Sequence, residues 1–373
     1  MSVNVTERLP SPEADRRPWG LRRFPLVWSL GLLTLVLLAL VHIGVGTLEL
    51  SPRQVVLALV GQAESALHHT VVWEIRLPRA LVALVAGGLL GLAGAVLQTL
   101  TRNPLAEPGL LGISSGAVLA IVLTMVLMGN GTLPTFGGNH LILPLVGALG
   151  GFMAGVMVYS LSYQRGSLAG VDPMRLVLVG VLVAGINGSL IAATLLVAQE
   201  EQVLRIVQWT VGSTSGRVWP HWHTIWPVAL VAVPLTMVVI GLAGVLMLGD
   251  GLATGLGASV ARARIALFAL TALLTAGAVS VVGAVGFVGL VGPHAARLVA
   301  WNLPRRLFPL AMLFSAILLL TSDIVARTLT LDGLTALTGL SIPAGAQVPV
   351  GAITALLGAP FFLFLLLRGR VNL

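Results

Sequence analysis

Residues 78–100 read PRALVALVAGGLLGLAGAVLQTL, a run whose only charged side chain is Arg79. An α-helix crosses the hydrocarbon core of a membrane with about 20 apolar residues, whereas a barrel strand needs only about 10. Gly87, Gly91 and Ala95 recur at every fourth position, which puts small residues on one face of such a helix. The stretch therefore predicts a transmembrane helix that packs closely against its neighbours.

Similar runs recur along the whole chain. Hydrophobic residues make up 57% of the 373 positions and charged residues only 9%, against about 25% charged residues in soluble domains. Lipid requires every backbone hydrogen bond to be closed within the structure, so we expect an all-α, polytopic membrane protein. The other apolar runs cover 24–46, 110–128, 141–163, 175–198, 223–248, 265–283, 307–330 and 348–367.

The number of crossings follows from the arginines. Between Arg264 and Arg297 the apolar stretch exceeds one membrane thickness, and glycines interrupt its second half. We expect it to divide into a span at 265–283 and a short span at about 286–300, which gives ten transmembrane helices. Both termini then lie in the cytoplasm with most of the arginines, as the positive-inside rule predicts. Residues 1–23 are predicted to form a disordered, basic cytoplasmic tail.

The residue types exclude several functions. All 21 basic residues are arginines, so the chain cannot hold an ordinary Walker A ATP site, which needs a lysine. Without cysteine there are no disulfides or thiolate metal sites. The arginines are scattered between the spans, which argues against nucleic-acid binding. We expect no catalytic residues, no metal site and no cofactor in this chain.

The acidic residues bear on the energy source. Almost all lie in loops or at span ends, whereas an ion-coupled transporter places carboxylates at membrane depth. If the chain moves a solute uphill, another polypeptide must therefore supply the energy. The deepest carboxylate is Asp323, and Arg327 follows at helical pairing distance. A span-end ion pair and a functional role for Arg327 both fit this spacing. His221-Trp222-His223 is more typical of an interfacial loop than of a metal site.

Several segments together resemble a known family. They are RLPR at 76–79, GLAGAVLQ at 91–98, RNPLAEPGLLGISSG at 102–116, GFVGLVGPHAARL at 286–298, DIVAR at 323–327 and VPVGAITALLGAPFF at 348–362. Over residues 24–370 the chain resembles the permease subunits of the ABC importers for iron-siderophores, haem and vitamin B12. This range is the predicted transmembrane permease domain.

The resemblance implies one part of a larger machine in the bacterial plasma (inner) membrane. The expected partners are a second permease subunit, taken as an identical copy, two cytoplasmic ATPase subunits that bind ATP and magnesium, and an extracytoplasmic binding protein. We expect a ferric siderophore as the substrate, with haem and cobalamin as alternatives. An ion-coupled secondary transporter is the alternative of a different class.

The resemblance also implies roles for individual residues. Members of the family have outward-facing arginines that contact acidic residues of the binding protein. Arg76, Arg79 and Arg327 match these arginines. The predicted cytoplasmic gate comprises Asn103, Leu105, Pro173 and Met174. The segment that couples to the ATPase is expected at Gly249, Asp250, Ala253, Leu256 and Gly257. The family usually carries Glu and a polar or basic residue in that segment, where this chain has Asp250 and Thr254.

Overall fold

The computed structural model describes residues 19–46, 48–128, 141–164, 170–300, 302–329 and 347–367. Within these ranges the regular structure is helical, apart from one isolated bridge between Tyr163 and Val171. Most of the predicted tail, residues 1–18, lies outside the described residues, as do Arg368 and Arg370 beyond the last helix. The described part of the chain confirms an all-helical, polytopic membrane protein.

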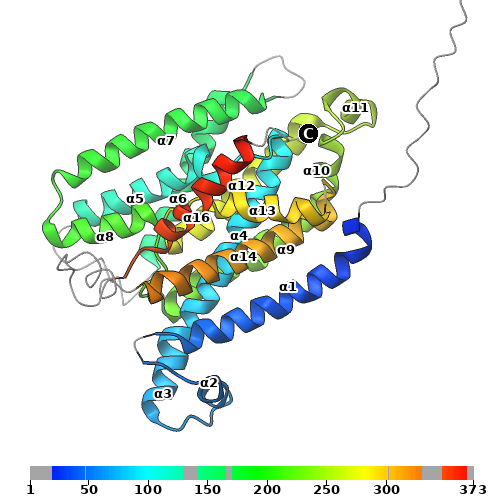
Figure 1. Ribbon diagram of the computed structural model, residues 1–373. Coiled ribbons are helices and arrows are strands. Elements are labelled where there is room, and N and C mark those ends of the chain that lie inside the picture. Colours follow the sequence, from blue (N-terminus) through cyan, green and yellow to red (C-terminus); the bar gives the residue numbers. More distant parts are fainter. Residues whose placement is uncertain are drawn as a thin grey trace, which may run out of the picture.

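The apolar helices form one bundle (Figure 1). Their bounds are Trp19–Gly44 (α1), Leu77–Thr101 (α4), Ile113–Leu127 (α5), Ile142–Ser162 (α6), Pro173–Leu195 (α7), Trp219–Val238 (α9), Val260–Val282 (α12), Val288–Ala300 (α13), Pro304–Thr328 (α14) and Val350–Leu367 (α16). Among the described residues, seven helices are long and apolar enough to cross a membrane, and α5 and α16 are shorter apolar helices.

Short helices connect these long ones. They are Pro52–Leu59 (α2), Ala66–Thr70 (α3), a π-helical turn at Val71–Arg76, a 3-10 turn at Pro108–Leu111, Glu200–Val211 (α8), Ile240–Leu246 (α10) and Asp250–Gly255 (α11).

We use outer end for the side of the bundle that holds residues 42–79, 212–218 and 323–329. The opposite side, with residues 101–107, 171–175 and 246–264, is the inner end. Both terms follow the predicted topology.

The long apolar stretch between Arg264 and Arg297 is divided into two helices, as expected. Helix α12 ends at Val282, and α13 begins at Val288. Gly283 has a φ of +76° and Phe287 a φ of +66°. Glycine adopts such a backbone readily, but a bulky side chain does so rarely. We refer to residues 283–287 as the helix break.

Helix α4 lies at the centre of the bundle, and its most apolar window is 83% buried, against 17% for α1 and α9. Gly87 and Gly91 of its predicted small-residue face lie against α14, and Gly94, which is not part of that face, lies against α13. A Cβ atom added at Gly91 would lie 2.5 Å from the carbonyl oxygen of Ala311, and one at Gly94 only 1.8 Å from that of Gly289. The backbones therefore approach more closely than any larger residue allows.

This close approach predicts the effect of adding one methyl group. Gly94→Ala should destabilise the protein by about 1–3 kcal/mol, because α4 and α13 must separate to fit the new atom. The thermal unfolding midpoint in detergent measures this effect. Gly185→Ala, on α7, is the matched control because no neighbouring atom lies within 4 Å of its added Cβ. Equal midpoints for the two variants would contradict the packing described here.

Candidate functional site

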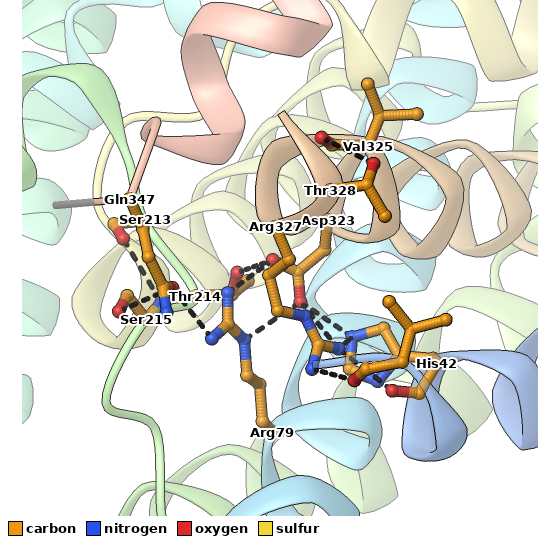
Figure 2. A network of polar contacts seen from close by, with 11 residues as sticks. His42, Arg79, Ser213, Thr214, Ser215, Asp323, Val325, Arg327, Thr328 and Gln347 are labelled. Atoms are coloured by element: carbon orange, nitrogen blue, oxygen red, sulfur yellow. Dashed lines mark hydrogen bonds and ion pairs between the residues drawn. The ribbon is translucent and has the colours of Figure 1, made fainter. Parts of the chain in front are cut away.

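At the outer end, the carboxylate of Asp323 joins four segments of the chain (Figure 2). The side chain is fully buried in the last turns of α14. Its Oδ1 accepts hydrogen bonds from Arg79 Nη2 at 2.7 Å and from Thr214 Oγ1 at 2.6 Å. Its Oδ2 accepts one from Arg79 Nε at 3.0 Å and lies 2.6 Å from His42 Nε2. One carboxylate thus connects α1, α4, α14 and the loop before α9, and its contact with Arg79 is bidentate.

Arg327 lies one turn beyond Asp323 and faces the same histidine. Its Nη2 contacts His42 Nε2, donates to the His42 carbonyl at 3.1 Å, and lies 3.7 Å from Asp323 Oδ2. Its Nη1 donates to the carbonyl of Val45 at 3.3 Å. The ion pair, one of the two interpretations that fit the i, i+4 spacing, is therefore present, and it belongs to a larger network.

Arg76 stabilises the neighbouring end of α1. Its Nη1 donates to the carbonyls of Ile43 and Gly44, both at 2.8 Å, and its Nη2 donates to that of Leu48. These bonds satisfy carbonyl groups at the C-terminus of α1, which would otherwise lack partners inside the helix.

The structure brings the three predicted docking arginines together at the outer end, but their side chains turn inward. Arg76, Arg79 and Arg327 are 5%, 8% and 8% exposed. Each is hydrogen-bonded within the chain, so a charge reversal would break internal contacts as well as alter the surface. The docking role stays a prediction.

A further arginine, Arg217, adds to the positive charge of the outer end. Its guanidinium stacks over Trp209, 4.9 Å from the ring centroid. Among the described residues no carboxylate lies within 4.0 Å of it. Burial, and then the charge of Arg79, lower the pKa of Arg217 to about 10, so it stays protonated at neutral pH. Of these four arginines, only Arg79 and Arg327 pair with the buried carboxylate of Asp323.

Sequence reasoning missed the part played by His42. The available signal was a titratable side chain inside the first apolar run, because such residues are costly in lipid and are usually paired. The His221-Trp222-His223 segment opens α9. The Val218 N–H donates to His221 Nδ1 at 3.3 Å, and His223 stacks on Trp219. Within the described residues no group of three or more His, Asp or Glu side chains could hold a metal ion.

At the inner end, the predicted gate residues occupy two helix connections. The first follows Arg102, which ends α4 with a φ of +51°. Asn103 and Leu105 form a local turn there, in which the Leu105 N–H donates to Asn103 Oδ1 at 2.9 Å. The second connection leads into α7. Helix α7 begins at Pro173, and the next residue, Met174, is 70% exposed.

The second connection is fixed by its cap and by packing. The Asp172 carboxylate accepts the N–H groups of Met174 at 2.8 Å and Arg175 at 3.0 Å, as expected of an N-cap residue. Pro173 lines a small cavity with Leu100 and Arg264, so this connection lies beside the end of α4 and the start of α12.

The predicted coupling segment forms the short helix α11 between α10 and α12. Gly249 precedes it and Gly257 follows it, with φ of +99° and +79°. Ala253 is fully buried, whereas Leu252 and Leu256 are 65% and 68% exposed. The helix therefore presents apolar side chains away from the bundle, at an end where it lies apart from the long helices (Figure 1).

Asp250 attaches this helix to both inner connections. Its carboxylate pairs with Arg264 Nη2 at 2.9 Å and with Arg102 Nη2. Arg102 ends α4 next to the first connection, and Arg264 also donates to the carbonyl of Val171 in the second. Asp250 thus bonds α11 to residues at both connections.

Comparison with known proteins identifies the family of this chain. The profile of the FecCD transport family matches residues 33–368. The chain belongs to the FecCD transport family. This confirms the resemblance drawn from the sequence motifs. Members of this family are permease components of transport systems rather than enzymes, and this FecCD protein is a multi-pass protein of the inner membrane.

Named relatives of this FecCD protein span nearly its whole length. It is 38% identical to the achromobactin transport system permease protein CbrC of Dickeya dadantii, covering 92% of this chain and 91% of that one. It is 37% identical to the hemin transport system permease protein HmuU of Yersinia pestis, covering 91% and 94%. A solved structure of an ABC transporter assigned to the metal-chelate type, in an inward-facing conformation, has a TM-score of 0.75 at 28% identity, covering 92% and 99%.

The Asp323 network predicts a large loss of stability when its charge is removed. Asp323→Asn leaves Arg79 and Arg327 buried without their counter-charge, which should cost roughly 3–5 kcal/mol. The thermal midpoint of the purified protein measures the loss. Glu74→Gln is the matched control, because Glu74 is exposed at the same end of the bundle. A midpoint for Asp323→Asn equal to that of the control would show that the network does not hold the outer end together.

Proposed function

We propose that this FecCD protein is the membrane-spanning subunit of a binding-protein-dependent, ATP-driven importer for ferric siderophores. Support for the substrate comes from the relatives, which include permeases named for achromobactin, iron(3+)-hydroxamate and Fe(3+) dicitrate. Permeases named for hemin and vitamin B12 are 37% and 34% identical. Haem and cobalamin therefore remain the alternative substrates.

The proposed topology has ten crossings with both termini in the cytoplasm. Seven long apolar helices, the two shorter ones and α13 together supply these ten crossings. Helix α13 has only 13 residues, fewer than the roughly 17–25 that usually span a bilayer. The helix break before it, packed within the protein, extends that part of the chain across the membrane.

The observation that carries the proposal is the form of α11. This helix has exposed leucines at the inner end and is joined through Asp250 to both helix connections. Such a helix suits contact with a cytoplasmic ATPase, which would bind the ATP and magnesium. Two ATPase subunits and a second permease subunit, proposed to be an identical copy, complete the transporter. Movement of α11 would open and close the gate at Asn103, Leu105, Pro173 and Met174.

Docking of the extracytoplasmic binding protein is proposed at the outer end. The cluster of Arg76, Arg79, Arg327 and Arg217 is positively charged, because Asp323 is the one carboxylate within it, while Glu49, Glu64 and Glu74 lie elsewhere at this end. The field of these charges attracts an acidic partner even though the guanidinium groups are hydrogen-bonded internally.

The role of α11 predicts the effect of charging its exposed face. Leu252→Glu combined with Leu256→Glu should abolish co-purification of the ATPase with the permease, because the apolar contact would be replaced by two negative charges. Leu67→Glu is the matched control, since Leu67 is a similarly exposed leucine at the outer end. Normal recovery of the ATPase with the double variant would place the contact elsewhere on the permease.

The substrate and the energy source are tested together in proteoliposomes. With ATPase, binding protein and internal ATP present, we expect uptake of a ferric siderophore to exceed that of haem and cobalamin. Uptake should be unaffected when proton and sodium gradients are collapsed. Gradient-driven uptake by the permease alone would instead establish a secondary transporter, and preferred uptake of haem or cobalamin would reassign the substrate.

A further inference from the structure

The first inner connection turns back into the bundle after the gate residues. Ala106 and Pro108 are both buried. A Cβ atom added at Gly289 would lie 2.9 Å from Cδ of Pro108. The side-chain amide of Gln98 donates to the carbonyls of both Ala106, at 3.2 Å, and Gly289, at 3.3 Å. This connection is therefore packed against the first turn of α13.

Glu107 makes the direct bond between this connection and the helix break. Its Oε1 accepts the backbone N–H of Phe287, the residue just before α13. Among the described residues no cation forms an ion pair with this carboxylate. Burial raises the pKa of Glu107 to about 7, although the bond from Phe287 acts in the opposite direction. A desolvated carboxylate without a counter-ion is unfavourable, so its position calls for an explanation.

Phe287 is fixed on both its backbone and its side chain. Its φ of +66° is one that a bulky residue rarely adopts and keeps only when its surroundings impose it. The N–H bond to Glu107 provides one such restraint. The side chain provides the other, since a Cβ atom added at Gly358 of α16 would lie 2.3 Å from Cβ of Phe287. The connection, the break and α16 therefore form one chain of contacts.

The same break is also bonded to the end of α8. The Ala284 N–H donates to the carbonyl of Trp209 at 3.0 Å, and the Ser213 N–H to that of Val282 at 2.8 Å. The Gly351 N–H at the start of α16 donates to the Gly212 carbonyl at 3.1 Å. The end of α8 thus reaches the break through the Trp209 carbonyl, and α16 reaches it through the close packing of Gly358 on Phe287. Glu107 alone among these contacts uses an ionisable side chain.

We propose that Glu107 is a positioning residue of the transport cycle, which links the gate at Asn103 and Leu105 to the helix break and, through Phe287, to α16. This inference rests on the proposed transport function. Broken helices are the parts of transporters where backbone rearrangement can accompany a change of access. A movement of the first connection would pull on the Phe287 N–H, so that the break and α16 follow it.

The test compares two replacements of Glu107 in the complete transporter in proteoliposomes. In Glu107→Gln the amide oxygen can still accept the Phe287 N–H, so uptake per ATP hydrolysed should remain within about twofold of wild type. Glu107→Leu keeps the bulk but has no acceptor. This variant should assemble and hydrolyse ATP, yet its uptake per ATP should fall roughly tenfold. Glu74→Leu, at an exposed glutamate of the outer end, is the matched control.

A second substitution tests whether Phe287 carries the link. Phe287→Ala keeps the N–H but removes the ring from Gly358, so it should also lower uptake per ATP. Because both changes interrupt one path, the double variant Glu107→Leu with Phe287→Ala should be no worse than the more affected single variant. Independent, multiplying losses would overturn the link.

The remaining outcomes separate this inference from the proposed function. Normal coupling in Glu107→Leu, or an equal defect in Glu107→Gln, would overturn the hydrogen-bond role while leaving the importer intact. A loss of uptake that only matches a loss of assembled transporter would reduce Glu107 to a residue needed for folding. Absence of ATP-driven uptake in the wild-type complex would contradict the proposed function itself.

Discussion

The contact of α4 with α13 and α14 through glycine is the constraint on which the rest of the structure depends. In lipid there is little hydrophobic gain from bringing two apolar helices together, so association relies on close packing. Gly91 and Gly94 allow carbonyl oxygens of neighbouring helices to approach where a Cβ atom would stand. Ser315 of α14 sits at the same place and donates to the carbonyl of Val288, the first residue of α13. The centre of the bundle is therefore fixed by backbone proximity rather than by large side chains.

Because α4 is held so tightly, it connects the two ends of the molecule. Near its outer end it carries Arg79, which donates hydrogen bonds to both oxygens of the Asp323 carboxylate. Toward its inner end Gln98 bonds the first connection to α13, and Arg102 pairs with Asp250 of α11. One arginine at each end of α4 thus takes part in each cluster. The two clusters differ in burial: the outer one is buried, whereas the side chain of Asp250 at the inner end is 39% exposed.

The outer cluster is a buried set of arginines around one carboxylate. Asp323 neutralises one positive charge and fixes Arg79 and Arg327 in place, but Arg76 and Arg217 have no carboxylate partner among the described residues. These buried cations are stabilised because Arg76 donates to backbone carbonyls and Arg217 stacks on the ring of Trp209. The internal bonds thus hold the guanidinium groups in fixed positions.

The sequence by itself determined the helical class, the positions of the long helices and the family. These follow from the length of apolar runs, which the membrane thickness sets, and from glycine spacing, which marks close packing. It also located the helix break between 265–283 and 286–300. The short helices α2, α3 and α8 escaped notice, because they lie between the runs. Only the tertiary structure decided that Arg76, Arg79 and Arg327 turn inward, that His42 meets Asp323, and that Glu107 meets Phe287. The partners in these last two contacts lie 281 and 180 residues apart, and no local period in a sequence reports which distant residues the packing of helices brings together.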